Sequence, residues 1–124
     1  MKNSEIVANA ADFILKSADD YNFHNELVTK YNKLIGDIEH ELELGKHDRD
    51  GLAKLARELR DARRERRKSK DIVEELQPVV DFLGVQENRK QIGKLQELVG
   101  KMRKVEFYHE HRFYTPRVRG NEND

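Results

Sequence analysis

Residues 55–76, LARELRDARRERRKSKDIVEEL, lie within the longest regular pattern of the chain. Seam positions recur at alternating steps of three and four residues, and most of them are apolar or small. They are Leu52, Leu55, Leu59, Ala62, Arg66, Ser69, Val73, Leu76, Val80 and Leu83. A repeat near 3.5 residues over this length predicts a helix that packs lengthwise against an antiparallel neighbour or a partner chain.

The preceding residues predict the antiparallel neighbour. A stripe from Phe23 to Leu42 suits a helix, Gly45 suits its end, and Asp48 or Asp50 suits the start of the next helix. We therefore expect a helical hairpin over residues 19–77. Residues 1–18 predict a separate N-terminal helix that buries one face, before a restart at Asp19 and Asp20. That face carries Ile6, Ala10, Phe13, Ile14 and Ala18.

Beyond the hairpin, Pro78 is expected to kink or end its helix near Gln77. Residues 78–104 form a kinked or second helical part, in which Ile92, Leu95, Val99 and Met102 share one face. Residues 105–119 alternate like an extended strand, with a continued helix as the alternative, and such a strand would pair with another subunit. The expected fold is mainly α: one domain over residues 1–124, with a helical hairpin, a further helix and a short β tail, in an oligomer.

Composition supports assembly, because only 36% of the 124 residues are hydrophobic and 39% are charged, which leaves one elongated chain little interior. The chain has no cysteine, no long apolar run and no signal-peptide core at its start. We expect a cytoplasmic protein without a membrane partner. A formal net charge of zero gives no whole-chain signal for nucleic acid.

Cations crowd residues 63–70, which the hairpin places opposite residues 26–33, where Glu26 is the single carboxylate. Either these cations form a solvated helix face, or they bind an anion such as phosphate through residues such as Arg63 and Arg67. The hairpin also places the acidic residues 37–43 opposite Lys54, Arg57 and Arg60. These three cations can therefore form ion pairs within the hairpin.

Two other segments could bind an anion. Asn88 and Arg89 open a predicted helix, whose N-terminus favours phosphate, although capping also explains Asn88. The tail combines arginines with aromatic rings, as a nucleotide site would and as a packed edge strand would. Its candidate residues are Arg112, Phe113, Tyr114, Thr115 and Arg117.

Catalytic patterns are incomplete. A metal-dependent nucleotide hydrolase of the helical type needs carboxylate pairs three residues apart on two helices. Glu58 and Asp61 have that spacing, but Glu39, Glu41 and Glu43 are two residues apart, so the set is incomplete. Asp37 with His40 is a single weak pair, and His109 with His111 lacks a third ligand. No phosphate loop or nucleophile motif occurs. We expect no enzyme, no metal and no cofactor.

Three segments together suggest a family: DIEHELEL at 37–44, ELRDARRERRKSKD at 58–71 and RFYTPRV at 112–118. Over about residues 25–118 the chain resembles the phage anti-Thoeris proteins known as sponges, which sequester cyclic ADP-ribose signals. The resemblance implies a non-catalytic homo-oligomer in the host bacterial cytosol that binds a cyclic nucleotide at subunit interfaces. It also implies pocket roles for Arg112, Tyr114, Thr115 and Arg117.

Two alternatives stay open from the residues alone. One is a helical nucleic-acid-binding protein that uses residues 63–70 against backbone phosphates. The other is a structural coiled-coil adaptor of a phage, whose arginines solubilise the helix and pair with carboxylates.

Overall fold

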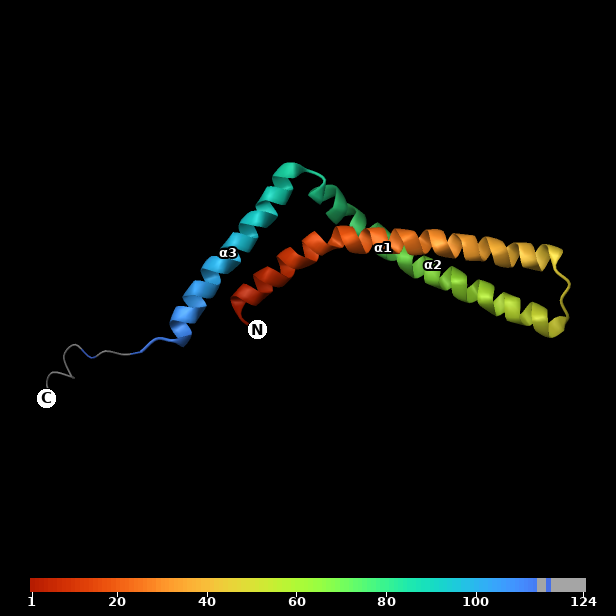
Figure 1. Cartoon of the computed structure of the whole chain (residues 1–124), viewed down its shortest axis with the longest axis horizontal. Coiled ribbons are helices and arrows are strands. Elements are labelled where there is room, and N and C mark those ends of the chain that lie inside the picture. Colours follow the sequence, from red (N-terminus) through yellow and green to blue (C-terminus); the bar gives the residue numbers. More distant parts are fainter. Residues whose placement is uncertain (114–115, 117–124) are drawn as a thin grey trace.

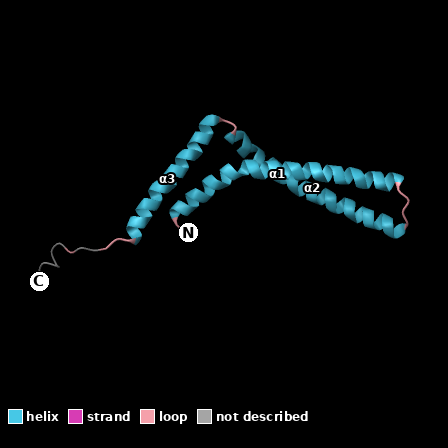
Figure 2. Cartoon of the chain, in the orientation of Figure 1, coloured by secondary structure: helices cyan, strands magenta, loops and turns pink. Residues whose placement is uncertain are grey.

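The computed structural model describes residues 1–113 and 116, and this part of the chain is mainly α, as expected. Three helices follow one another: α1 (Asn3–Leu44), α2 (Arg49–Leu83) and α3 (Gln86–Glu110) (Figure 1). Figure 2 shows helices joined by short loops, with no strand in the described residues.

The predicted hairpin is confirmed. The second half of α1 and most of α2 lie side by side and antiparallel, and α3 turns back along the first part of α1 (Figure 1). Asp48 is the N-cap of α2, and its Oδ1 accepts a hydrogen bond of 2.8 Å from the Gly51 amide. This bond satisfies one of the free amides in the first turn and fixes the point at which the chain re-enters a helix.

Two small apolar clusters hold the helices together. In the hairpin, Ile35 and Ile38 of α1 enclose Ala62 of α2. Where all three helices meet, Ala11, Leu83 and Ile92 form the second cluster. Only seven apolar side chains are buried in the described residues, so each buried contact carries a large share of the stability. Assembly with further copies stays a prediction.

A polar layer separates the two clusters inside the α1–α2 contact. The Tyr21 hydroxyl donates to Gln77 Oε1 at 2.6 Å, and His24 Nδ1 lies 3.3 Å from the Ser69 hydroxyl. Arg66, the polar position of the predicted seam, donates to Asn32 Oδ1 at 3.2 Å. Ser69 is buried and Arg66 is half-buried, so the seam faces α1 even where it is not apolar.

The predicted buried face of residues 1–18 was wrong in part. Ile6 and Phe13 are 54% and 58% exposed, whereas Ser4, Ala11 and Ser17 are buried. The buried positions carry small side chains, because these let the α1 backbone approach its neighbours closely, and this gain outweighs the larger apolar area of Ile6 and Phe13.

The predicted restart at Asp19 and Asp20 does not occur, and α2 does not end at Pro78. α1 continues through Asp19 and Asp20, so residues 1–18 and 19–44 are one helix. α2 likewise continues through Pro78 to Leu83. The Tyr21–Gln77 bond before the proline and the packing of Val79 and Leu83 after it hold both sides of the missing backbone hydrogen bond in place.

The prediction of an extended tail was wrong for residues 105–110, which form the last turns of α3. Glu106 and Glu110 lie four residues apart on one helix face, where Glu106 accepts from Ser4 and Glu110 pairs with Lys2. These contacts with the start of α1 override the strand preference of the neighbouring aromatic residues. Residues 111–113 lie outside the helix, and 114, 115 and 117–119 are outside the described residues.

Candidate anion-binding site

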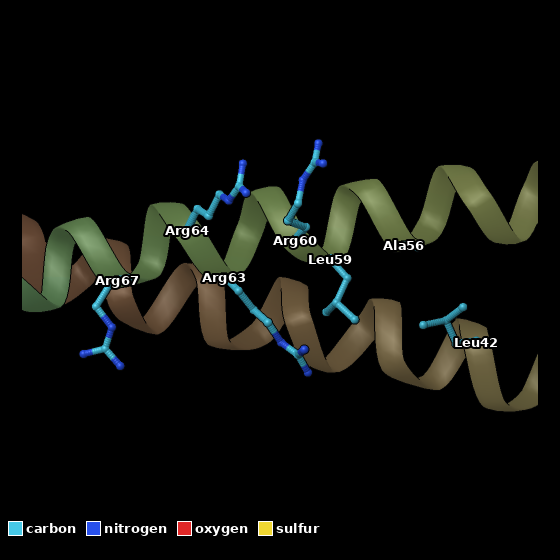
Figure 3. A pocket seen from close by; sticks show the side chains of 7 residues that line it. All are labelled: Leu42, Ala56, Leu59, Arg60, Arg63, Arg64 and Arg67. Atoms are coloured by element: carbon cyan, nitrogen blue, oxygen red, sulfur yellow. The ribbon is translucent and has the colours of Figure 1, made fainter.

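α2 places four arginines around one shallow hollow (Figure 3). Arg60, Arg63, Arg64 and Arg67 lie three, four and seven residues apart, so that their side chains emerge from neighbouring positions on the helix surface. Leu42 of α1, with Ala56 and Leu59 of α2, supplies the apolar part of the lining. The hollow has a volume of about 420 Å³ and opens to solvent.

The arginines project on two sides of α2. Arg60 and Arg64 point away from α1, whereas Arg63 and Arg67 reach down alongside it (Figure 3). A ligand in the hollow would therefore meet guanidinium groups on both sides and aliphatic carbon between them. This combination suits a molecule with phosphates and an apolar ring.

Carboxylates partly neutralise the cluster. Arg63 Nη2 lies 3.2 Å from Glu39 Oε1, Arg60 Nε lies 3.3 Å from Asp61 Oδ1, and Arg67 Nη1 lies 3.9 Å from Asp71 Oδ1. The prediction that the hairpin leaves residues 63–70 without a counterion is therefore wrong for Arg63 and Arg67, and also for Lys68, which pairs with Glu65 at 3.0 Å.

The register itself is close to the predicted one, since Arg66 lies beside Asn32 and Tyr21 beside Gln77. Glu39 is six residues beyond residue 33, the predicted neighbour, and the long Arg63 and Glu39 side chains bridge this offset.

These ion pairs are weak. The side chains of Arg60, Arg63 and Arg67 are 53–60% exposed, and exposed pairs contribute less than about 1 kcal/mol each. Arg64 has no carboxylate within ion-pair distance among the described residues. An anionic ligand could displace the partners of three arginines at low cost and use Arg64 directly.

The sequence missed part of this site. Arg63 and Arg67 were predicted, but Arg60 and Arg64 were not singled out, and Leu42 and Leu59 were assigned only to the helix contact. The three- and four-residue steps from Arg60 to Arg67 carried the signal for the cations. The apolar lining could not be found in the same way, because it combines side chains from two helices.

Asn88 and Arg89 lie elsewhere, at the start of α3. The Asn88 side chain donates to the Phe82 carbonyl oxygen at 3.0 Å, which satisfies a free acceptor at the end of α2. Val85, not Asn88, is the N-cap of α3, and Arg89 is exposed. Asn88 therefore already has a structural role.

The predicted tail site lies at the far end of α3. Arg112 stands over the Tyr108 ring with 5.5 Å between its Cζ and the ring centroid, and Phe113 is 83% exposed. Tyr114, Thr115 and Arg117 lie outside the described residues. Within one chain, the arginine cluster, the start of α3 and the end of α3 are three separate places (Figure 1).

No group of three or more His, Asp or Glu side chains in the described residues is placed to hold a metal ion. Over the same residues, none of the helices combines the length and apolar character needed to cross a membrane. No protein-family model matches the chain, and no curated protein or solved structure shows significant similarity to it.

Proposed function

We propose that this chain is a non-catalytic phage counter-defence protein that binds and sequesters a cyclic nucleotide signal of the cyclic ADP-ribose type in the host bacterial cytosol. The observation that supports it most is the arrangement of Arg60, Arg63, Arg64 and Arg67 around an apolar hollow. The resemblance of residues 37–44, 58–71 and 112–118 to the sponge proteins supplies the ligand class.

The chemistry of the hollow fits such a ligand. A guanidinium group grips two phosphate oxygens at once, and four of them can serve a diphosphate from both sides. Leu42, Ala56 and Leu59 offer apolar surface to a base or sugar. A sequestering protein changes no bond in its ligand, so affinity and the number of sites determine its effect.

A second copy is part of this proposal. An open hollow leaves much of a ligand in water, whereas tight binding needs a largely closed pocket. The tail of the same chain lies at the other end of the molecule, so Arg112 and Phe113 would reach the hollow only from another subunit (Figure 1). Tyr114, Thr115 and Arg117 would accompany them.

Isothermal titration calorimetry with cyclic ADP-ribose isomers and cyclic oligonucleotides tests the proposal. We expect one member of the panel to bind, to be recovered chemically unchanged after release, and to lose at least about tenfold in affinity in the double variant Arg63→Gln/Arg64→Gln. The matched control, Arg57→Gln/Arg103→Gln, removes the same charge outside the hollow and should bind normally. The proposal is rejected if no member of the panel binds to the folded, assembled protein.

Nucleic acid is the second candidate ligand. Arg60 to Arg67 span about 10 Å along α2, a length that can follow a phosphate backbone. Binding of this kind weakens steeply with salt and tolerates many sequences, whereas a cyclic nucleotide in a closed pocket depends less on salt. A salt titration with DNA and RNA therefore separates the two candidates.

A further inference from the structure

The hairpin has a second hollow, lined by a different side of α2 from the arginine cluster. Its apolar part consists of Tyr31, Leu34 and Ile38 of α1 with Ala62 of α2, and its volume is about 290 Å³. Leu34 is 41% exposed, so this apolar surface is open to solvent. Carboxylates take the place that arginines have in the first hollow. They are Glu58, Asp61 and Glu65.

A neighbouring hollow extends this surface toward the tip of the hairpin, since Ile38 and Glu58 line both. It adds the carboxylates Asp37 and Glu41 and the cation Lys54. Five carboxylates thus follow one side of the α1–α2 contact. We call this surface the acidic groove, and define it by Leu34, Ile38, Asp37, Glu41, Glu58, Asp61 and Glu65.

The acidic groove and the arginines lie on opposite sides of α2. Successive residues of a helix are rotated by about 100°, so residues two apart point in nearly opposite directions. Each groove carboxylate of α2 is followed two positions later by an arginine of the hollow in Figure 3. The pairs are Glu58 and Arg60, Asp61 and Arg63, and Glu65 and Arg67. α2 therefore carries a carboxylate row and an arginine row with the same spacing of three and four residues.

Ion pairs within the chain leave the acidic groove open to a cationic partner. Asp37 and Glu58 have no lysine, arginine or histidine within ion-pair distance in the part of the chain that the structure describes. Glu41 pairs with a histidine. Asp61 and Glu65 pair with neighbours on α2, but their side chains are 64% and 47% exposed, and exposed pairs are weak.

Charge and spacing together favour a second copy of this chain as that partner. Its arginine row repeats the spacing of the carboxylate row, so when the two α2 helices run parallel each carboxylate can face one arginine of the second copy. Both surfaces also have apolar residues between the charges, Leu34 and Ile38 in the groove and Leu42 and Leu59 in the arginine hollow. Any basic helix would match the charge, whereas the second copy matches the spacing as well.

We propose that the acidic groove of one copy binds the arginine side of α2 in a second copy. The two surfaces are different, so the contact is heterologous, and each pair of copies keeps one unused surface of each kind for further copies. An anionic ligand and the acidic groove are alternative partners of the same arginines. This assembly therefore belongs to the ligand-free protein, and it does not rest on the proposed function.

Two double variants remove one surface each. Arg63→Gln/Arg67→Gln removes charge from the arginine row, and Glu58→Gln/Glu65→Gln removes it from the carboxylate row. Sedimentation velocity at micromolar concentration in low salt should find the wild type associated, and each variant should raise the dissociation constant more than about tenfold. High salt should weaken the association of the wild type, because it screens the exposed charges.

Matched controls remove the same charges elsewhere. Lys101→Gln/Arg103→Gln lies on α3, and Glu74→Gln/Glu75→Gln lies on α2 outside the groove, in exposed positions. Both controls should associate like the wild type. Circular dichroism verifies that every variant is helical.

Mixing the two interface variants gives the sharpest test. The arginine variant keeps its acidic groove, and the glutamate variant keeps its arginine row, so a one-to-one mixture restores a single functional contact. Native mass spectrometry should find each variant monomeric alone and a heterodimer in the mixture. This heterodimer should not grow, because neither copy has a second functional surface.

The proposal is overturned by a monomeric wild type in low salt, by controls that weaken association as much as the interface variants, or by folded interface variants whose mixture forms no heterodimer. The outcome is separable from the proposed function. Glu58→Gln/Glu65→Gln keeps every arginine, so it should lose self-association while it retains any binding of a cyclic nucleotide.

Discussion

Ser4 and Glu106 join the two ends of the described fold: the Ser4 hydroxyl donates to Glu106 Oε2 at 3.0 Å across 102 positions of the sequence. Ser4 is 2% exposed, and Glu106 Oε1 is buried without a hydrogen-bond partner. Among the described residues, the Ser4 hydroxyl is thus the one group that donates a hydrogen bond to this carboxylate. The bond holds a negative charge at the start of α1, where the helix dipole favours one.

Ser4→Ala should therefore lower the free energy of unfolding by about 1–2 kcal/mol, because a half-buried carboxylate loses its donor. Ser17→Ala is the matched control. Ser17 is equally buried, but its hydroxyl donates to the Phe13 carbonyl oxygen of its own helix at 2.7 Å, so its removal should be nearly neutral. Urea unfolding of both variants provides the measurement, and equal losses would contradict the role of the Ser4–Glu106 bond.

The Lys2–Glu110 ion pair should make stability depend on pH. The hydrogen bond and charge of Lys2 lower the pKa of Glu110, and the same contact raises the pKa of Lys2. A lowered carboxyl pKa contributes stability above the ordinary value of 4.5, and this contribution is lost as pH falls through the lowered pKa. A raised lysine pKa contributes below 10.5 and is lost as pH rises through the raised value.

The difference in melting temperature between wild type and Glu110→Gln should thus be largest between these two limits and should shrink in high salt. Glu97→Gln, on the same helix, lacks an ion pair in the described residues and should show no such profile. A flat difference across the acid range would refute the contribution of the pair.

Ile38 should be among the most sensitive positions of the hairpin. It is 5% exposed and packs with Ile35 and Ala62, so Ile38→Ala leaves a cavity and should cost about 2–4 kcal/mol. Leu34, one turn earlier on α1, is 41% exposed, and Leu34→Ala should cost less than about 1 kcal/mol. Similar values for both in chemical unfolding would mean that the hairpin packs through a different face.

Arg66 is the one charged residue among the seam positions of α2. Arg66→Met should stabilise the hairpin by about 1 kcal/mol, because an apolar side chain fills the half-buried position and the exposed Asn32 can bond to water instead. Arg64→Met, on the exposed side of α2, should leave the melting temperature within about one degree. Calorimetry on both variants decides this, and destabilisation by Arg66→Met would assign the arginine a structural role in the seam.

Pro78 interrupts the hydrogen bonds of α2 without ending it. Pro78→Ala restores an amide donor in an exposed position and should raise the free energy of unfolding by about 1–3 kcal/mol. If the proline instead sets a bend that Val79 and Leu83 need to reach Ala11 and Ile14, the variant will be less stable in urea.

The sequence alone determined the helical class, the hairpin, a cap at Asp48 or Asp50, the seam of α2 and the face of α3 that carries Ile92 and Val99. Each of these follows from periodicity or from a local hydrogen bond, which depend on residues close together in the chain. Arg63 and Arg67 were identified for the same reason, as cations on a predicted helix.

Only the tertiary structure decided which face of α1 is buried, that α2 continues past Pro78 and α3 to Glu110, and that Glu39 reaches Arg63. α1 has one face with small residues and another with Ile6 and Phe13, and periodicity cannot choose between them. The choice depends on how closely a neighbouring helix can approach, and the helix ends depend on contacts such as Lys2–Glu110 between residues far apart in the sequence.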